Sequence, residues 1–182
     1  MTVTINKSKI KTLFSEEQIA AKVTELAGEI SRDYASEDNL VVVGVLKGAF
    51  IFTADLVRKL SIPCEIEFIR LSSYHKGTES SGDVKAYDLT LPDLNEKNVI
   101  IVEDIIDSGR TAKFLQNFFT YQSKAKTVKI ATLFNKPCKR IDELKDLKPD
   151  YACFEIDDKF ILGYGLDYEQ NFRELPYVGY IS

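Results

Sequence analysis

The segment of this chain with the most potential chemistry is VIIVEDIIDSGRT, at residues 99–111. An apolar run leads into the adjacent carboxylates Glu103 and Asp104, and a turn of small polar residues follows at 107–111. Such a turn can hold a phosphate, because a helix N-terminus presents free N–H groups and Gly109 lets the backbone approach an anion closely. The two carboxylates can accept hydrogen bonds from the hydroxyls of a sugar. A capped helix after two solvated acids is the plain alternative, but this order of residue types is rarer.

A lysine follows each of two other apolar runs, just as Glu103 and Asp104 follow the apolar run at 99–102. Lys47 lies in VGVLKGAF at 43–50, and Lys136 lies in FNKPC at 134–138. A positive side chain at the end of a strand can bind an anion or donate to a carbonyl oxygen. A surface lysine beside a turn is the plain alternative for each, and neither motif decides between the two by itself.

The charge of the chain excludes one class of partner. With 24 basic and 28 acidic residues, the net charge is −4 and the pI is near 5.2. An acidic surface repels a phosphate backbone instead of releasing its counterions, so non-specific nucleic-acid binding is not expected. A phosphorylated substrate must therefore be held by local donors or by a metal ion.

The cysteines predict neither a disulfide framework nor a zinc site. Cys64, Cys138 and Cys153 are odd in number and far apart, and His75 is the chain's only imidazole. The first residues lack a charged segment followed by an apolar run, and no apolar run is long enough to span a bilayer. We therefore expect a cytoplasmic protein.

Strands and helices that alternate along the chain must position these motifs. Apolar runs rich in β-branched residues predict buried strands at 40–46, 98–102 and 127–134. Helical spacing predicts helices at 15–34, 49–60 and 112–121. This alternation is typical of an α/β domain with a parallel sheet, in which ligands bind at the carboxyl ends of the strands. The 182 residues, 45% of them hydrophobic, are expected to form a single domain over 1–182.

The first helix carries the clearest local signals. Ser15 and Gln18 have the spacing of a capping box, so the helix is expected to begin there. Six apolar residues share one face and are expected to be buried: Ile19, Ala20, Val23, Leu26, Ala27 and Ile30.

A polar segment, SSYHKGTESSGDVK, separates the first two strand-and-helix units at 72–85. It contains hardly any apolar side chain, so it cannot bury itself in a core. A lid over a binding site and a mobile hairpin tip explain this composition about equally well. His75 has no partner in the sequence and is assigned no role.

The segment 99–111 resembles the phosphoribosyl pyrophosphate signature of type I phosphoribosyltransferases. From about Val41 to its end, the chain resembles the hypoxanthine-guanine branch of that family. The resemblance implies a central, mainly parallel sheet flanked by helices, with a small hood and a flexible lid loop. It also implies that Glu103 and Asp104 hold the ribose hydroxyls and that Asp107 is the general base for the purine. The residues implied to bind the rest of the phosphoribosyl group are Asp107, Ser108, Gly109, Arg110 and Thr111.

The same resemblance assigns a pyrophosphate site. Its loop would consist of Leu46, Lys47 and Gly48, and the family often has a non-proline cis peptide between the first two. Ser73 and Tyr74 match the Ser-Tyr pair of the family's lid, and Arg173 would contact pyrophosphate.

The tail at 155–175, EIDDKFILGYGLDYEQNFREL, closely resembles the family's purine-binding tail. Phe160 would stack on the base, and the Ile161 backbone would read its edge, although a core strand explains FIL equally well without the family. Lys136 would donate to the 6-oxo group. The remaining purine-site residues by resemblance are Ile105 and Asp167. Asp167 would also hold Mg²⁺, together with Glu103 and Asp104.

The implied activity is transfer of the 5-phosphoribosyl group from phosphoribosyl pyrophosphate to hypoxanthine or guanine, with IMP or GMP and pyrophosphate as products. Relatives commonly form homodimers or homotetramers. A regulatory protein that kept the fold but binds RNA or a transcription factor is the competing hypothesis. Xanthine or adenine specificity is a narrower rival. Ribose-phosphate pyrophosphokinase shares the signature, but such chains are much longer.

Overall fold

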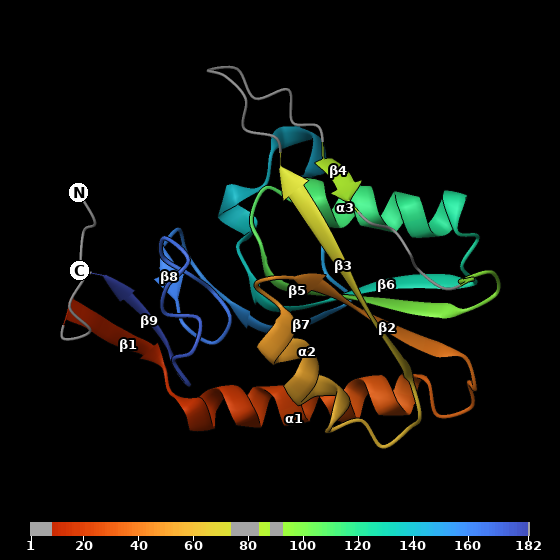
Figure 1. Cartoon of the computed structure of the whole chain (residues 1–182), viewed down its shortest axis with the longest axis horizontal. Helices are drawn as coiled ribbons and strands as arrows, with labels where there is room; N and C mark the ends of the chain where they lie inside the picture. The colour runs from red at the N-terminus through yellow and green to blue at the C-terminus, as the bar shows by residue number, and fades with distance from the viewer. Residues whose placement is uncertain (1–8, 74–83, 88–92, 182) are drawn as a thin grey trace.

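The computed structural model describes residues 9–73, 84–87 and 93–181, and its centre is a six-stranded sheet (Figure 1). The strand order is β4-β3-β2-β5-β6-β7, and all neighbours are parallel except β3 and the edge strand β4. The strands are β2 Leu40–Leu46, β3 Glu65–Ser73, β4 Val84–Tyr87, β5 Asn98–Ile106, β6 Thr127–Asn135 and β7 Tyr151–Glu155. The predicted α/β fold with a mainly parallel sheet is confirmed.

Helices cover both faces of this sheet (Figure 1). The helices α1 (Glu16–Asp33) and α2 (Phe50–Val57) pack on one face, over a core that includes Val42, Ile100 and Val102. The helix α3 (Arg110–Asn117) packs on the other face, against the alternate residues of β2 and β5. Because β2 and β5 are buried on both faces, their sequences are continuous apolar runs rather than alternating ones.

A second, three-stranded antiparallel sheet lies beside the main one and corresponds to the predicted hood. Its order is β1-β9-β8, with β1 at Ile10–Phe14, β8 at Ile161–Leu162 and β9 at Val178–Ile181. Strands from the two ends of the described chain are therefore side by side in Figure 1. This sheet holds the segment between β8 and β9, which belongs to the predicted purine-binding tail.

The helix α1 follows its sequence signals closely, with one exception. The Ser15 hydroxyl accepts from the Gln18 backbone N–H at 3.3 Å, and the Gln18 side chain accepts from the Ser15 N–H at 2.9 Å. The predicted apolar face is buried apart from Ala20. Ala20 is exposed because it borders an open pocket between α1, α2 and the segment before β9.

The predicted boundaries of three elements were wrong. The strand β5 runs to Ile106, so Glu103 to Ile106 extend the strand, held by parallel pairing that reaches Ile106 and Asn135. The helix α2 ends at Val57 instead of residue 60. The helix α3 begins at Arg110 and changes at Phe118 into a short π-helical turn that ends at Gln122.

The parallel register brings the carboxyl ends of β2, β5 and β6 to one edge of the sheet. In the pairing, Gly44 lies opposite Val102, and Ile106 lies opposite Asn135. The three motifs that follow these strands therefore start beside one another. No helix in the described ranges is long and apolar enough to cross a membrane.

Candidate active site

The turn after β5 forms an open cavity of about 190 Å³ at the N-terminus of α3. Gly109 is the residue before the helix, and its φ of +83° lies in the left-handed region that glycine adopts without steric cost. The backbone N–H of Arg110 donates to the Ser108 hydroxyl at 3.4 Å. The cavity is lined by Glu103, Ile105, Ile106, Asp107, Ser108, Gly109, Thr111 and Ala112. Hydroxyls and helix N–H groups at such a place suit an anion.

Glu103 and Asp104 are carboxylates placed at the base of this turn with little solvent. Glu103 is buried, and its Oε1 has no hydrogen-bond partner among the described residues. Burial, with the nearby charge of Asp104 as a second cause, raises the pKa of Glu103 well above its ordinary value. Burial likewise raises the pKa of Asp104 to about 6. Part of the Asp104 residue is exposed, but its carboxylate lies so close to Gly48 that a Cβ there would come within 1.6 Å of Oδ2.

These carboxylates suit a ligand that brings hydrogen-bond donors or positive charge. A buried, unpartnered carboxylate oxygen is costly unless something binds to it. No group of three or more His, Cys, Asp or Glu side chains in the described part of the chain gathers into a ready metal cage. Glu103 and Asp104 carry carboxylate oxygens, which are the ligand type that Mg²⁺ prefers, and Mg²⁺ usually keeps water or substrate oxygens as its other ligands.

The loop after β2 lies against both the carboxylates and the tail. The peptide between Leu46 and Lys47 is cis, as the family resemblance predicted. The Lys47 ammonium donates to Gln170 Oε1 at 3.2 Å. A Cβ on Gly165, whose φ is +98°, would come within 2.1 Å of the Gly48 carbonyl oxygen, so the two loops meet backbone to backbone.

The tail between β8 and β9 is a tight, hydrogen-bonded loop that presents an ion pair. Arg173 pairs with Asp167 at 2.6 Å and also donates to the Gly165 carbonyl at 2.7 Å. The Gln170 backbone N–H donates to Asp167 Oδ2 at 2.8 Å. Four residues of the loop other than glycine have positive φ: Tyr164, Glu169, Gln170 and Phe172. Such a backbone persists only where surrounding contacts hold it, and it is frequent at ligand sites.

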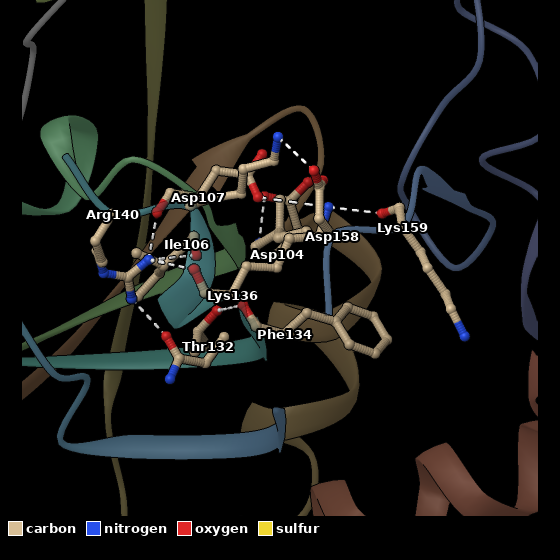
Figure 2. A network of polar contacts seen from close by, with 12 residues as sticks. Asp104, Ile106, Asp107, Thr132, Phe134, Lys136, Arg140, Asp158 and Lys159 are labelled. Carbon is tan, nitrogen blue, oxygen red and sulfur yellow. Dashed lines mark hydrogen bonds and ion pairs between the residues drawn. The ribbon is translucent and has the colours of Figure 1, made fainter. Parts of the chain in front are cut away.

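Lys136 lies directly after β6 and reaches the turn at 107–111, which is called the phosphate turn below (Figure 2). It is only 5% exposed, and its ammonium donates to the Lys159 carbonyl at 2.7 Å. The same nitrogen lies 3.5 Å from Asp107 Oδ1. Phe160 follows Lys159, is 61% exposed, and meets the Tyr168 ring edge-on at a centroid distance of 5.7 Å. An exposed aromatic face thus lies near a cation and a carboxylate.

Known proteins resemble this chain over nearly all of its length. Residues 9–169 match the phosphoribosyl transferase domain family. A hypoxanthine-guanine phosphoribosyltransferase of Streptococcus mutans is 46% identical over 172 residues, covering 94% of this chain and 93% of the relative. The chain belongs to the hypoxanthine-guanine phosphoribosyltransferase family.

Solved structures of this phosphoribosyltransferase family superpose closely on the chain. A hypoxanthine-guanine phosphoribosyltransferase from Bacillus anthracis, with HEPES in its active site, is 44% identical, with a TM-score of 0.86. It covers 94% of this chain and 98% of its own. The Trypanosoma cruzi hypoxanthine phosphoribosyltransferase in complex with the product IMP is 33% identical, with a TM-score of 0.87, covering 98% of this chain and 97% of its own.

Not every residue that the phosphoribosyltransferase resemblance assigns can be placed. Ser73 is the last residue of β3. Tyr74, like His75 and most of the predicted lid, lies outside the described residues. Ile161 belongs to β8 and is buried, so the alternative of a core strand holds for its side chain. Its backbone role stays a prediction.

Two residues of this site were missed by reasoning from the sequence. Arg140 donates to backbone carbonyls at the start of the turn after β5 and to the Lys136 carbonyl after β6, and Gln170 accepts from Lys47. Arg140 lies in a polar stretch, KPCKR, with no periodicity, and its partners are mainly backbone atoms. Gln170 lies 123 positions from Lys47, and only the fold brings the two together.

Proposed function

We propose that this chain transfers the 5-phosphoribosyl group of phosphoribosyl pyrophosphate to hypoxanthine or guanine, giving IMP or GMP and pyrophosphate. Family membership supports the reaction, as do relatives named for it and a neighbour solved with IMP. The observation in this chain that carries the proposal is the 3.5 Å between the Lys136 ammonium and the Asp107 carboxylate. A cation suited to a purine oxygen lies there beside a turn suited to a sugar phosphate.

The turn after β5 would hold the ribose 5-phosphate. Its backbone N–H groups and hydroxyls are donors for the phosphate, supplied by Asp107, Ser108, Gly109, Arg110 and Thr111. Glu103 and Asp104 would accept hydrogen bonds from the two ribose hydroxyls. The unpartnered Glu103 oxygen supports this role, because a ligand hydroxyl would satisfy it.

The loop after β2 and the tail would hold the pyrophosphate. Lys47 and Arg173 supply positive charge, and the backbone of Leu46 and Gly48 lies where the two loops meet. Ser73 and Tyr74 would join them from the lid. Both cations already pair with groups of the tail, so pyrophosphate would exchange one set of acceptors for another.

The purine would bind between Lys136 and the tail. Lys136 would donate to the 6-oxo group, and since an ammonium has no acceptor it disfavours the 6-amino group of adenine. Phe160 would stack on the base with the face that it leaves exposed. The Ile161 backbone, Ile105 and Asp167 would complete this side of the site.

We propose that the enzyme uses Mg²⁺. Asp167 would hold it on the pyrophosphate side, with Glu103 and Asp104 as carboxylates on the ribose side. When bound, the ion neutralises charge on the polyanionic substrate. An acidic chain that binds such a substrate needs this, since its net charge is −4.

In the reaction, the bond from the ribose anomeric carbon to the pyrophosphate oxygen breaks as purine N9 forms its bond to that carbon from the opposite face. The developing positive charge on the ribose is oxocarbenium-like, so water must be excluded. Asp107 would hold and accept the proton at purine N7 while N9 attacks. The phosphate turn with its two carboxylates and the purine site around Lys136 form two half-sites. Orientation of the substrates by these half-sites, rather than covalent chemistry, supplies most of the acceleration.

An assay of the purified chain tests this proposal. With phosphoribosyl pyrophosphate, Mg²⁺ and hypoxanthine, the chain should release pyrophosphate and form IMP. A panel of hypoxanthine, guanine, xanthine and adenine should show turnover of the first two and little turnover of adenine. If no purine is consumed and the chain instead retains RNA, the regulatory hypothesis would replace the enzymatic one.

We also propose one domain over residues 1–182, acting in the cytoplasm as a homodimer or homotetramer. The family match over 9–169 supports one domain, and three free cysteines suit a reducing compartment. Exposed apolar side chains on β3 and α2, namely Ile66, Phe68 and Phe50, support self-association. Light scattering after size exclusion would give the assembly state.

A further inference from the structure

Within the described part of the chain, Arg140 makes more hydrogen bonds to the site than any residue assigned a role above, although it is assigned no ligand. Its Nη1 donates to the carbonyls of Ile106 at 2.6 Å and of Lys136 at 3.3 Å, and also to the carbonyl of Asp107. Its Nη2 donates to the Asn135 side chain. Figure 2 shows several dashed lines that start from the Arg140 guanidinium and run to these acceptors.

The accepting groups belong to two turns, of which one is proposed to bind the ribose 5-phosphate and the other the purine. Ile106 and Asp107 lie where β5 passes into the phosphate turn, whereas Asn135 and Lys136 lie where β6 passes into the segment proposed to bind the purine. The sheet itself links these strands only as far as their last pair, Ile106 and Asn135, with one further bond from the Lys136 N–H to the Ile106 carbonyl at 3.0 Å. Beyond that pair, the Lys136–Asp107 ion pair at 3.5 Å and a bond from the Ile141 N–H to the Ser108 carbonyl at 3.4 Å each make one link between the turns, whereas Arg140 bonds to several groups on both of them.

The stem of Arg140 also contacts the phosphate turn from beneath. A Cβ on Gly109 would lie 3.2 Å from Arg140 Cδ and 2.8 Å from Leu147 Cδ2, so both side chains pack against this glycine. Arg140 Nε donates to the Leu147 carbonyl at 3.4 Å, which restrains the side chain itself. A planar guanidinium held on both sides can fix several carbonyls in one geometry, which a lysine ammonium cannot.

We propose that Arg140 is a positioning residue that fixes Lys136 and Asp107 relative to the phosphate turn, so that one nucleotide can occupy both half-sites at once. This inference rests on the proposed function. Transfer between two bound substrates needs their reacting atoms within about 3–3.5 Å. A small displacement between the turns would leave each half-site able to bind its own fragment but not a molecule that spans both.

This proposal is tested by comparing a spanning ligand with a fragment. For Arg140→Ala we expect the Kd of IMP to rise by at least about tenfold, equivalent to about 1.4 kcal/mol. The Kd of ribose 5-phosphate, which needs one turn only, should stay within about threefold, equivalent to roughly 0.7 kcal/mol. A change of that size can come from the loss of one distant positive charge alone. Calorimetric titration of both ligands gives the two values.

Lys139→Ala is the matched control, because it removes a neighbouring cation whose ion pair is with Asp158 at 2.6 Å instead of with the two turns. It should leave both Kd values nearly unchanged. Equal losses for IMP and ribose 5-phosphate in Arg140→Ala would mean that Arg140 merely builds the phosphate turn, and no loss for either would mean that it has no role. Both results overturn the proposal.

Two further measurements keep the test decisive. Millimolar guanidinium should restore IMP binding to Arg140→Ala, whereas methylammonium should not. If that variant does not fold, Arg140→Lys takes its place: it keeps the charge but not the planar fork, so it should still lose IMP affinity, and wild-type affinity would refute the bridge. If the wild-type chain itself binds neither ligand, the proposed function fails, and this inference fails with it.

Discussion

Asp107 and Lys136 form a partly exposed ion pair whose two members have different proposed roles. The side chain of Asp107 is 54% exposed and that of Lys136 is 7% exposed, so only Lys136 is confined by the fold. Asp107→Asn should therefore leave the structure intact and lower kcat by about 10²- to 10⁴-fold, the usual contribution of general acid-base catalysis. Steady-state kinetics beside a circular dichroism spectrum measures both effects. Turnover within a few-fold of wild type would remove Asp107 from the mechanism.

Lys136 should determine the choice of purine. Lys136→Ala should raise the KM for hypoxanthine and weaken discrimination against adenine, because no donor would remain for the 6-oxo group. Lys136→Gln should shift the preference further, since its amide oxygen can accept from a 6-amino group. Competition between hypoxanthine and adenine, measured for the three proteins, gives the ratios. An unchanged preference in both variants would refute this role.

Gln170 is a neutral partner of Lys47, whereas a carboxylate at this position would compete with pyrophosphate for the Lys47 ammonium. Its Oε1 lies 3.2 Å from the Lys47 ammonium. Gln170→Glu should raise the KM for phosphoribosyl pyrophosphate by roughly fivefold at low salt, since an exposed ion pair contributes at most about 1 kcal/mol. Gln170→Ala is the control and should change the KM little. The difference should shrink as ionic strength rises, and its persistence in high salt would contradict an electrostatic cause.

Chemical type and position at a strand end are readable from the sequence, which is why Glu103, Lys47 and Lys136 could be singled out from it. Contacts to backbone atoms of distant segments are not readable. Arg140 and Gln170 were missed because nothing about an arginine or a glutamine specifies which carbonyl or which lysine the fold brings beside it. The roles of the residues that were predicted still depend on the experiments above.

At the scale of the elements, local signals determined α1 and the buried strands, whereas tertiary pairing determined where they end. A capping box is a signal contained within four residues, so the start of α1 was predicted correctly. The end of β5 depends on pairing with β6, and the hood depends on β8, which has only two residues. Neither has a periodicity long enough to detect.

Ser15→Ala tests the contribution of the cap at the start of α1. The Ser15 hydroxyl accepts from the Gln18 N–H, and its removal should lower the free energy of unfolding by about 1 kcal/mol. Ser15→Asp keeps an acceptor there and should lose much less. Urea unfolding of the three proteins measures the difference, while kcat should stay constant because α1 contributes no residue to the site. Equal stability of the alanine and wild-type proteins would show that the cap contributes nothing.

On the scale of the whole molecule, we expect the buried carboxylates of the candidate site to destabilise the fold that carries them. Two carboxylates are placed where solvent is scarce at the edge of a sheet whose strands are otherwise apolar. Burial raises the pKa of Asp104 from 3.8 to about 6, so the folded state keeps a proton there that the unfolded state has already lost. Since the folded state binds more protons between those values, stability falls as the pH rises from about 4 to about 6.

Asp33 contributes to the pH dependence with the opposite sign. The Tyr151 hydroxyl donates to its carboxylate at 2.6 Å and, with Lys129, lowers the pKa of Asp33 below its ordinary value. A carboxyl with a lowered pKa stabilises the fold above its unfolded-state pKa, and that stabilisation is lost as the pH falls through the folded-state value. Asp33 lies at the surface, so its effect should be smaller than that of Asp104.

Substituting Asp104 and Asp33 separately distinguishes a carboxylate proposed to bind substrate from one that stabilises the fold. Asp104→Asn should raise Tm at pH 8 and change it little at pH 4, because it removes a charge that is costly only when ionised. Each kcal/mol recovered corresponds to about 2–4 °C in a chain of this length. Asp33→Asn should lower Tm at pH 8. Thermal unfolding in the absence of ligand, across this pH range, measures both.

The same Asp104→Asn protein should bind ribose 5-phosphate more weakly, since an amide is a poorer acceptor for ribose hydroxyls. A lower Tm at pH 8 would mean that Asp104 stabilises the fold, and the trade-off between binding and stability would not hold.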